Sequence, residues 1–342
     1  MTSLLPIVDA CDNFRIETSS EVLHPLYVHV PPETGDEPII GLLRASILEE
    51  LEKYNQKLIS EGSEPIWMIM EWTGDSVNGL IGRRILAAKV GDEKTRKMVG
   101  FSATLNTPEL RSDAIKVMCE RWHHAAEPFG DLIAGKMWRF ELYPIYSHPF
   151  VLDERKVAFA MERAATPLFG VVTYGVHLTM YTADYRIWVP RRAKTKQTFG
   201  GMLDNTVAGG IPRGYNAFES MVKECMEEAS LEEDVVRPRI KPAGAVSYIY
   251  QTRKGWLQPE VEYVYDLLVP PGEEGDPKYT PKPFDGEAES FELIPIDVVR
   301  EKMLAQEFKP NCALVLLDFM IRHGLLDASN EPHLLQILSR IH

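Results

Sequence analysis

Apolar side chains recur along the chain with two different periods, which indicates a mixture of helices and strands. Helical spacing is seen in 37–58, 107–125, 217–229, 296–306, 311–323 and 331–341. Stretches rich in β-branched and aromatic residues predict strands at 66–72, 168–181, 185–192, 243–253 and 260–269, with a hairpin turn at 182–184. The order of these elements predicts the α/β class.

The length of the chain and a change of character near Pro167 predict two domains. A chain of 342 residues is about twice a typical domain. We therefore expect a smaller mixed α/β domain at residues 1–165 and a second domain at 166–342. The first part carries no chemical motif, which leaves two roles open for it: it shapes a substrate pocket, or it mediates a homodimer.

Charge and cysteine content narrow the classes of function. The net charge of −13 argues against non-specific binding to nucleic acid or to anionic membranes. Four cysteines lie far apart, so neither a disulfide framework nor a zinc site is expected, and the thiols should be reduced and mostly buried. The amino terminus is acidic and no apolar run is long enough to span a bilayer, which predicts a cytoplasmic protein, with the nucleus as a further possibility.

The strongest chemical signal is an acidic helix that follows a glycine-rich segment. Asn216 is a capping-box-like start, which places the helix at about 217–229. Glu224, Glu227 and Glu228 stand at positions i, i+3 and i+4 and therefore share one narrow face, beside the apolar stripe. A solvated acidic face is the plain alternative, but such a face more often lies opposite the apolar stripe.

Three carboxylates on one rigid helix suit a hard divalent cation. Mg²⁺ or Mn²⁺ takes oxygen ligands and is usually shared with substrate phosphates. The flexible loop beside the helix contains Gly209 and Gly210, where the backbone can approach a diphosphate closely. Residues and spacing alone therefore predict a metal-dependent hydrolase of a small-molecule diphosphate.

The order of glycine, loop and acidic helix resembles the Nudix box. Gly209 matches the first glycine of that motif, and Glu224, Glu227 and Glu228 match its three metal-binding glutamates. The chain departs from the motif at three positions, with Tyr215 for Glu, Lys223 for Arg and Ser230 for Gly. None of the departures removes a metal ligand, and Lys223 is placed to pair with Glu227 one turn later.

A wider set of motifs narrows the resemblance. The segments "GKMWRFELYPIYS", "FGVVTYGVHLTMY", "TFGGMLDNTVAGGIPRG", "KECMEEASL" and "KPNCALVLLDFMIRHG" are together similar to the Nudix hydrolases related to the amino-terminal region of fungal thiamine pyrophosphokinase. This resemblance implies a Nudix α/β/α sandwich preceded by a smaller mixed α/β domain. It also implies metabolite damage repair, in which thiamine diphosphate and its oxy- and oxo-analogues are converted to monophosphates.

Residues outside the helix complete the predicted site. In "FDGEAESFELIP", which resembles the later acidic loop of Nudix enzymes, Glu287 is the first candidate for the general base and Glu289 the second. Two solvated glutamates are the alternative there. Arg191, Lys194 and Lys196 form a basic cluster, for which a phosphate-binding role competes with that of exposed charges at a strand end.

Several interpretations stay open at this point. Tyr174, His177 and Trp256 can stack on a heterocycle, but strand aromatics are more often packing residues, and His177 fits better as a hydrogen-bonded strand histidine than as a catalyst. A pyrophosphatase for a nucleoside diphosphate derivative such as ADP-ribose is the second enzymatic hypothesis. A non-catalytic module that senses its ligand is the third, because Tyr215 and Lys223 depart from the motif.

Overall fold

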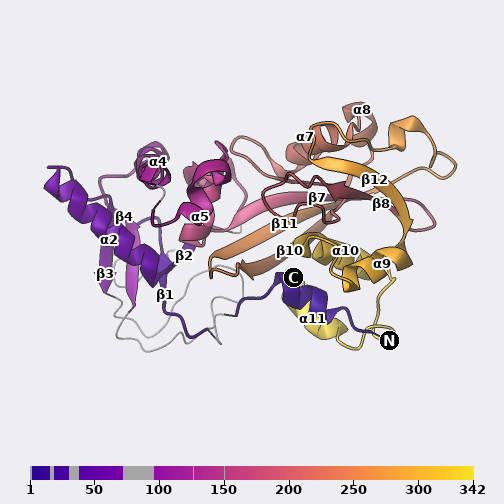
Figure 1. Cartoon of the computed structure of the whole chain (residues 1–342), viewed down its shortest axis with the longest axis horizontal. Coiled ribbons are helices and arrows are strands. Elements are labelled where there is room, and N and C mark those ends of the chain that lie inside the picture. Colours follow the sequence, from indigo (N-terminus) through magenta and orange to yellow (C-terminus); the bar gives the residue numbers. More distant parts are fainter. Residues whose placement is uncertain (1, 16–18, 31–37, 72–95, 126, 150) are drawn as a thin grey trace.

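The computed structural model describes residues 2–15, 19–30, 38–71, 96–125, 127–149 and 151–342. Within these ranges the chain forms two main sheets, one in each half, and helices pack against both (Figure 1). None of the helices in the described ranges is long and apolar enough to cross a bilayer. The mixed α/β class predicted from the sequence is confirmed.

The first half is built on a four-stranded sheet with the order β2-β1-β4-β3. Its strands are β1 (Leu23–Leu26), β2 (Gly41–Arg44), β3 (Trp67–Glu71) and β4 (Lys97–Phe101). The helices of this half are α2 (Ala45–Ser60), α4 (Pro108–Ala125) and α5 (Gly130–Ile133). Helix α4 also contacts the hairpin formed by β5 (Leu142–Tyr146) and β6 (Val157–Glu162).

The second half is a sandwich of helices around a six-stranded sheet. The strand order is β10-β11-β7-β8-β12, and β9 pairs with β7. The bounds are β7 (Thr173–Tyr181), β8 (Arg186–Arg192), β9 (Val207–Gly210), β10 (Lys241–Gln251), β11 (Leu257–Leu268) and β12 (Ala288–Pro295). Strands β7 and β11 run parallel, and the other strand pairs of this sheet are antiparallel.

Helices cover both faces of this sheet. On one face, Met221 and Cys225 of α7 (Ala217–Ala229) join a core with Val176 and Leu178 of β7, next to α8 (Glu233–Val236). On the other face, Leu314 of α10 (Pro310–Arg322) belongs to a second core, together with residues of α9 (Ile296–Leu304), α11 (Leu334–Ile341) and the amino-terminal α1 (Leu5–Cys11). Figure 1 shows α7 and α8 above the sheet and α9, α10 and α11 below it.

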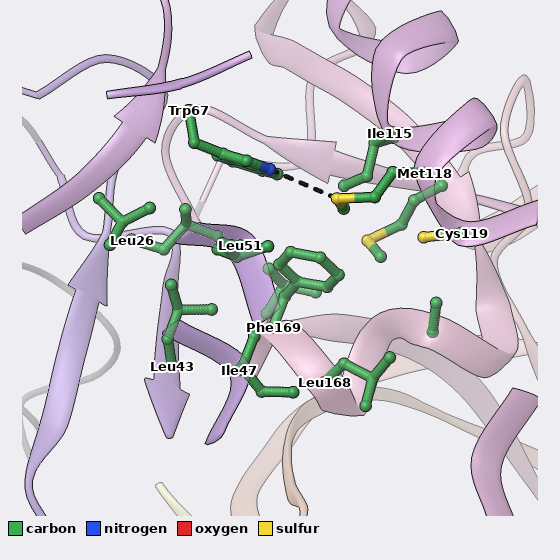
Figure 2. Packing of buried hydrophobic residues seen from close by; sticks show 14 of the residues in the cluster. Leu26, Leu43, Ile47, Leu51, Trp67, Ile115, Met118, Cys119, Leu168 and Phe169 are labelled. Atoms are coloured by element: carbon green, nitrogen blue, oxygen red, sulfur yellow. Dashed lines mark hydrogen bonds between the residues drawn. The ribbon is translucent and has the colours of Figure 1, made fainter. Parts of the chain in front are cut away.

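The core of the first half includes a residue from the start of the second. The Trp67 ring stacks on Phe101, with ring centroids 4.6 Å apart, and its indole N–H donates to Met118 Sδ at 3.4 Å. Phe169, from α6 (Thr166–Phe169), packs into the same cluster (Figure 2). The two halves therefore share packed side chains, and a domain boundary at about residue 165 stays a prediction.

Three predicted elements need correction. The helix predicted at 37–58 begins only at Ala45, because residues 41–44 form strand β2. At the start of this strand, a Cβ on residue 41 would overlap the Phe169 carbonyl oxygen, so glycine is required there. Residue 37 lies outside the described residues. The strand predicted from 168 begins at Thr173, because α6 ends at Gly170 in the left-handed conformation. The acidic loop predicted at 284–295 is strand β12 from Ala288 onward, paired with β8.

Candidate active site

Helix α7 has the bounds expected from the sequence. The Asn216 side chain accepts a hydrogen bond from the Glu219 N–H at 2.9 Å, which caps the first turn. At the other end Ser230 takes φ 53°, the left-handed conformation in which glycine is favoured. A serine at this position carries a small conformational penalty, yet its N–H still bonds the Cys225 carbonyl and closes the helix.

Two of the three glutamates of α7 lie against strand β9. The Glu224 side chain is 15% exposed and lies over Gly209, where a Cβ would overlap its carboxylate. Glu228 accepts a hydrogen bond from the Ala208 N–H at 3.1 Å. Gly209 and Gly210, expected in a flexible loop, belong instead to β9. A glycine is needed at 209 because the carboxylate approaches the strand backbone directly.

The third glutamate is turned toward solvent and toward Lys223. The Glu227 side chain is 51% exposed, and its carboxylate pairs with Lys223 Nζ at 2.6 Å, which confirms the expected pairing. Lys223 Nζ also lies 3.5 Å from Glu224. Tyr215, which stands where the motif has Glu, is 41% exposed. Lys223 is therefore the positive group between the carboxylates.

The partly buried carboxylates of Glu224 and Glu228 hold negative charge at high free energy. Burial raises the pKa of Glu224, and Glu227 adds to the shift against the opposing effect of Lys223. Burial raises the pKa of Glu228 well above its usual range, with further contributions from Glu224, Glu287 and Asp204. A group in this position takes up a proton or gains from a nearby cation.

The chemistry of these donors fits Mg²⁺ or Mn²⁺. Hard divalent cations prefer carboxylate oxygens, and α7 concentrates three of them within one helical turn. Within the described ranges, no group of three or more His, Cys, Asp or Glu side chains is already arranged around one ion position. The Glu227 side chain points away from the other two carboxylates, and Lys223 would compete with a metal ion for it.

Glu287 lies on the same side of the sheet as Glu228. The two carboxyl groups line a small hollow together with Arg192 and Asp204. Burial works against the charge of Glu287, but its ion pair with Lys196, at 2.5 Å, and a hydrogen bond with Glu228 lower its pKa. Glu287 is thus held as a carboxylate next to Glu228, which is the state that a proton acceptor needs.

The other predicted residues of this region play different parts. Lys196 contacts the site by its ion pair with Glu287. Arg191 Nη1 instead donates to the Gly201 carbonyl at 2.9 Å, in the loop that follows its own strand. The Lys194 side chain is exposed, and its backbone N–H donates to Glu289 Oε1 at 3.0 Å. The structure therefore brings Lys196 to the acidic site but not Arg191.

A cavity of about 200 Å³ lies across strand β9 from α7. Side chains alternate between the faces of a strand, and the two neighbouring glycines show this: Gly209 faces Glu224, whereas Gly210 faces the Tyr143 hydroxyl. The cavity is lined by both glycines, by Arg139, Tyr143 and Arg163 of the first half, and by residues of β7, β11 and α10. It borders the same strand backbone that the α7 glutamates contact.

The floor of the cavity is a buried polar network on β11 and β7. Glu262 Oε1 accepts from the Tyr248 hydroxyl at 2.7 Å and from Asn311 Nδ2 at 3.1 Å. Its Oε2 lies 3.4 Å from His177 Nε2. Burial opposes the charge of Glu262, but His177 and Tyr248 lower its pKa to about 2. This carboxylate is fully held by protein groups.

Glu260 is the carboxyl group of the network that remains open to the cavity. One of its oxygens is within hydrogen-bond distance of the oxygen of the same Tyr248 hydroxyl. Burial and the neighbouring Glu262 raise the pKa of Glu260 to about 7. His177 lies 2.7 Å from the Asn205 side-chain oxygen, which confirms it as a hydrogen-bonded strand histidine. Tyr174 also lines the cavity, whereas Trp256 packs in the core of the first half.

Comparison with known proteins identifies the family. The chain is 31% identical to Nudix hydrolase 20, chloroplastic, of Arabidopsis thaliana over 312 residues, which are 89% of this chain and 70% of that protein. This chain belongs to the Nudix hydrolase family. The predicted family and the predicted class of enzyme, a Nudix phosphoanhydride hydrolase, are thereby confirmed, and the thiamine-related subgroup remains a proposal.

Other matches of this Nudix protein cover less. It is 42% identical to the uncharacterized protein YJR142W of Saccharomyces cerevisiae over 224 residues, 60% of this chain and 61% of that protein. A family model described as a domain of unknown function, DUF4743, matches residues 88–173. The crystal structure of DR0079 from Deinococcus radiodurans covers 51% of this chain and 97% of its own, with 20% identity and a TM-score of 0.37.

Proposed function

We propose that this Nudix protein hydrolyses thiamine diphosphate and its oxy- and oxo-analogues to the monophosphate and phosphate, with Mg²⁺ or Mn²⁺ as cofactor. The observation that carries the proposal is a single strand, β9, with acidic α7 on one face and a cavity with a carboxyl floor on the other. A diphosphate at the end of this strand would be close to α7 while its organic part occupied the cavity.

The polar groups of the cavity favour a substrate with both signs of charge. Glu260 offers an oxygen to a ring that is positively charged or carries N–H donors. Arg139, Arg163 and Lys309 offer positive charge to a diphosphate. Thiamine diphosphate has a cationic ring, an aminopyrimidine and a diphosphate, and so it complements all of these groups. ADP-ribose has the diphosphate and an amino-bearing base but no cationic ring except through protonation.

The residues of α7 and the nearby Glu287 have distinct parts in the proposed reaction. Glu224, Glu227 and Glu228 would hold the metal, which neutralises the diphosphate and activates water when bound. The water oxygen forms a bond to the terminal phosphorus, the bond to the bridging oxygen breaks, and the monophosphate leaves with that oxygen. Glu287 accepts a proton on its carboxylate. Gly209 and Gly210, predicted to contact the diphosphate, instead give room to the Glu224 carboxylate and the Tyr143 hydroxyl, so the proposed reaction assigns them no direct contact with the substrate.

Product analysis on a substrate panel tests this function. Purified protein with Mg²⁺ is assayed with thiamine diphosphate, its oxy- and oxo-analogues, and ADP-ribose. We expect orthophosphate and a monophosphate from the thiamine compounds. Two monophosphate esters from ADP-ribose, with no turnover of the thiamine compounds, would instead establish the nucleotide pyrophosphatase. Tight binding of a thiamine compound without turnover of any substrate would establish the non-catalytic sensor.

A further inference from the structure

We propose that the first half of the chain forms one wall of the substrate cavity and that Arg139 in this wall binds the substrate's diphosphate. The inference rests on the proposed function for the identity of the substrate and goes beyond it in assigning a role to Arg139, which lies within residues 88–173, the part of the chain matched by a domain of unknown function. It makes Arg139 a specificity-determining residue supplied from outside the Nudix motif.

The wall is in direct contact with strand β9. A Cβ at Gly210 would overlap the hydroxyl of Tyr143, so the tyrosine lies against the strand backbone where a side chain would otherwise stand. The N–H of Arg213, in the loop that follows β9, donates to the Leu142 carbonyl at 3.3 Å. Strand β5 is thus joined to the glycine-rich segment by side-chain packing and by the backbone.

Two arginines of this wall face the cavity, and they differ in how their charge is balanced. Arg163 pairs with Glu141 at 2.9 Å and stacks over the Tyr143 ring, with 5.1 Å from its guanidinium carbon to the ring centroid. In the part of the chain that the structure describes, no carboxylate forms an ion pair with the Arg139 guanidinium within 4.0 Å. Of the two arginines, Arg139 is therefore the one whose guanidinium N–H groups can bind a ligand without breaking an ion pair.

The position of Arg139 is set by its backbone. Its N–H donates to Glu162 Oε1 at 2.9 Å, and Glu162 is buried at the end of β6. The next residue, Phe140, takes φ 57°, which turns the chain sharply before β5 begins. Burial and the nearby Arg163 lower the pKa of Arg139, while Glu141 and Glu287 oppose the shift. A partly desolvated guanidinium in this place gains from a bound diphosphate, which accepts two parallel hydrogen bonds from it.

Binding without turnover gives the direct test. Dissociation constants for thiamine diphosphate and for unphosphorylated thiamine are measured in EDTA, for the wild type, Arg139→Ala, Arg139→Gln and Arg139→Lys. We expect Arg139→Ala and Arg139→Gln to weaken thiamine diphosphate binding about tenfold to a hundredfold, with thiamine binding unchanged and Arg139→Lys in between. Arg155→Ala is the matched control, because Arg155 lies in the same half, is 88% exposed and pairs with the nearby Asp153.

Several outcomes would overturn the inference. Equal weakening for thiamine and thiamine diphosphate, or no weakening for either, would show that Arg139 does not bind the diphosphate. A variant whose thermal melt matches that of the wild type is correctly folded. Because Arg139→Ala and Arg139→Gln both remove the positive charge, the test can be completed with whichever of the two is soluble and folded. If the wild type rejects thiamine diphosphate but hydrolyses ADP-ribose, the proposed function is wrong, and the same comparison of ADP-ribose with adenosine then decides the role of Arg139.

Discussion

The carboxylate of Glu262 lies directly over the Cα of Gly175 on the neighbouring parallel strand, in the space that a Cβ would fill. Three protein groups hold that carboxylate in the cavity floor, so it cannot move aside freely. We predict that Gly175→Ala costs about 2 to 4 kcal/mol in the free energy of unfolding, because the methyl group displaces a buried, paired charge. Chemical denaturation of the purified variant measures this loss.

Gly275→Ala is the control for that substitution. A Cβ added at Gly275 would meet no atom within 4 Å apart from its chain neighbours, and the φ of this residue is not in the left-handed region. The variant should unfold with a free energy close to that of the wild type. Equal stability of Gly175→Ala and Gly275→Ala would show that Glu262 does not occupy this position.

Buried His24 predicts a loss of stability in acid. Its Nδ1 accepts the Lys97 N–H at 3.0 Å, and burial together with Arg96 and Lys97 lowers its pKa from 6.5 to about 4, against Glu52. Between these two values the unfolded chain binds one proton more, so this contribution is complete above pH 6.5 and is lost as the pH falls. The loss should reach about 3 kcal/mol.

His24→Asn tests this prediction, because asparagine keeps an oxygen acceptor near Lys97 and cannot titrate. The free energy of unfolding is measured against pH for both proteins. The wild type should lose more stability than the variant between pH 6.5 and about 4. Parallel curves over this window would assign the acid sensitivity to other groups.

The four cysteines should not react in the folded protein. Cys11, Cys119, Cys225 and Cys312 are all free and buried, and burial is the first cause that raises the pKa of each thiol. A protonated, inaccessible thiol is a poor nucleophile. We expect almost no reaction with a thiol reagent at neutral pH and four equivalents after denaturation. Rapid modification of any native thiol would contradict this burial.

Metal binding should stabilise the protein through the α7 carboxylates. A ligand that binds only the folded state adds about 2.7 kcal/mol at a concentration about a hundred times its dissociation constant. Thermal melts with Mg²⁺ or Mn²⁺ should therefore shift upward in the wild type and much less in Glu228→Gln. The glutamine still offers an acceptor to the Ala208 N–H, so the comparison isolates the charge. An equal shift in both proteins would place the metal elsewhere.

Local patterns revealed the acidic helix, whereas the cavity needed the tertiary structure. Helix α7 has the predicted bounds because its cap and its apolar stripe lie within one short segment. Gly41 and Gly170 shifted two other boundaries, since each is required by a close approach of chain segments that are far apart in sequence. Such contacts leave no trace in periodicity.

The carboxyl floor of the cavity went unpredicted although its signal was present. Glu260 and Glu262 stand two residues apart in a strand that is otherwise largely apolar, and so they point to the same face. The two glutamates become part of a site only because α10 and the first half of the chain bury that strand on both faces. The sequence of the strand alone does not show this burial. Arg139 lies in the segment "GKMWRFELYPIYS", but no pattern within that segment marks it as a cavity residue. Its place in the cavity wall depends on tertiary packing, in which the neighbouring Tyr143 lies against Gly210.

The most direct test of the proposed active site is the rate of orthophosphate release from thiamine diphosphate in Mg²⁺, compared between the wild type, Glu228→Gln and Glu233→Gln. Glu233 is an exposed residue of α8 that pairs with Arg237, and it serves as the matched control. We predict wild-type turnover, no change in Glu233→Gln, and a fall of about a hundredfold or more in Glu228→Gln. Full activity in Glu228→Gln, or no orthophosphate from the wild type, would contradict the proposed active site.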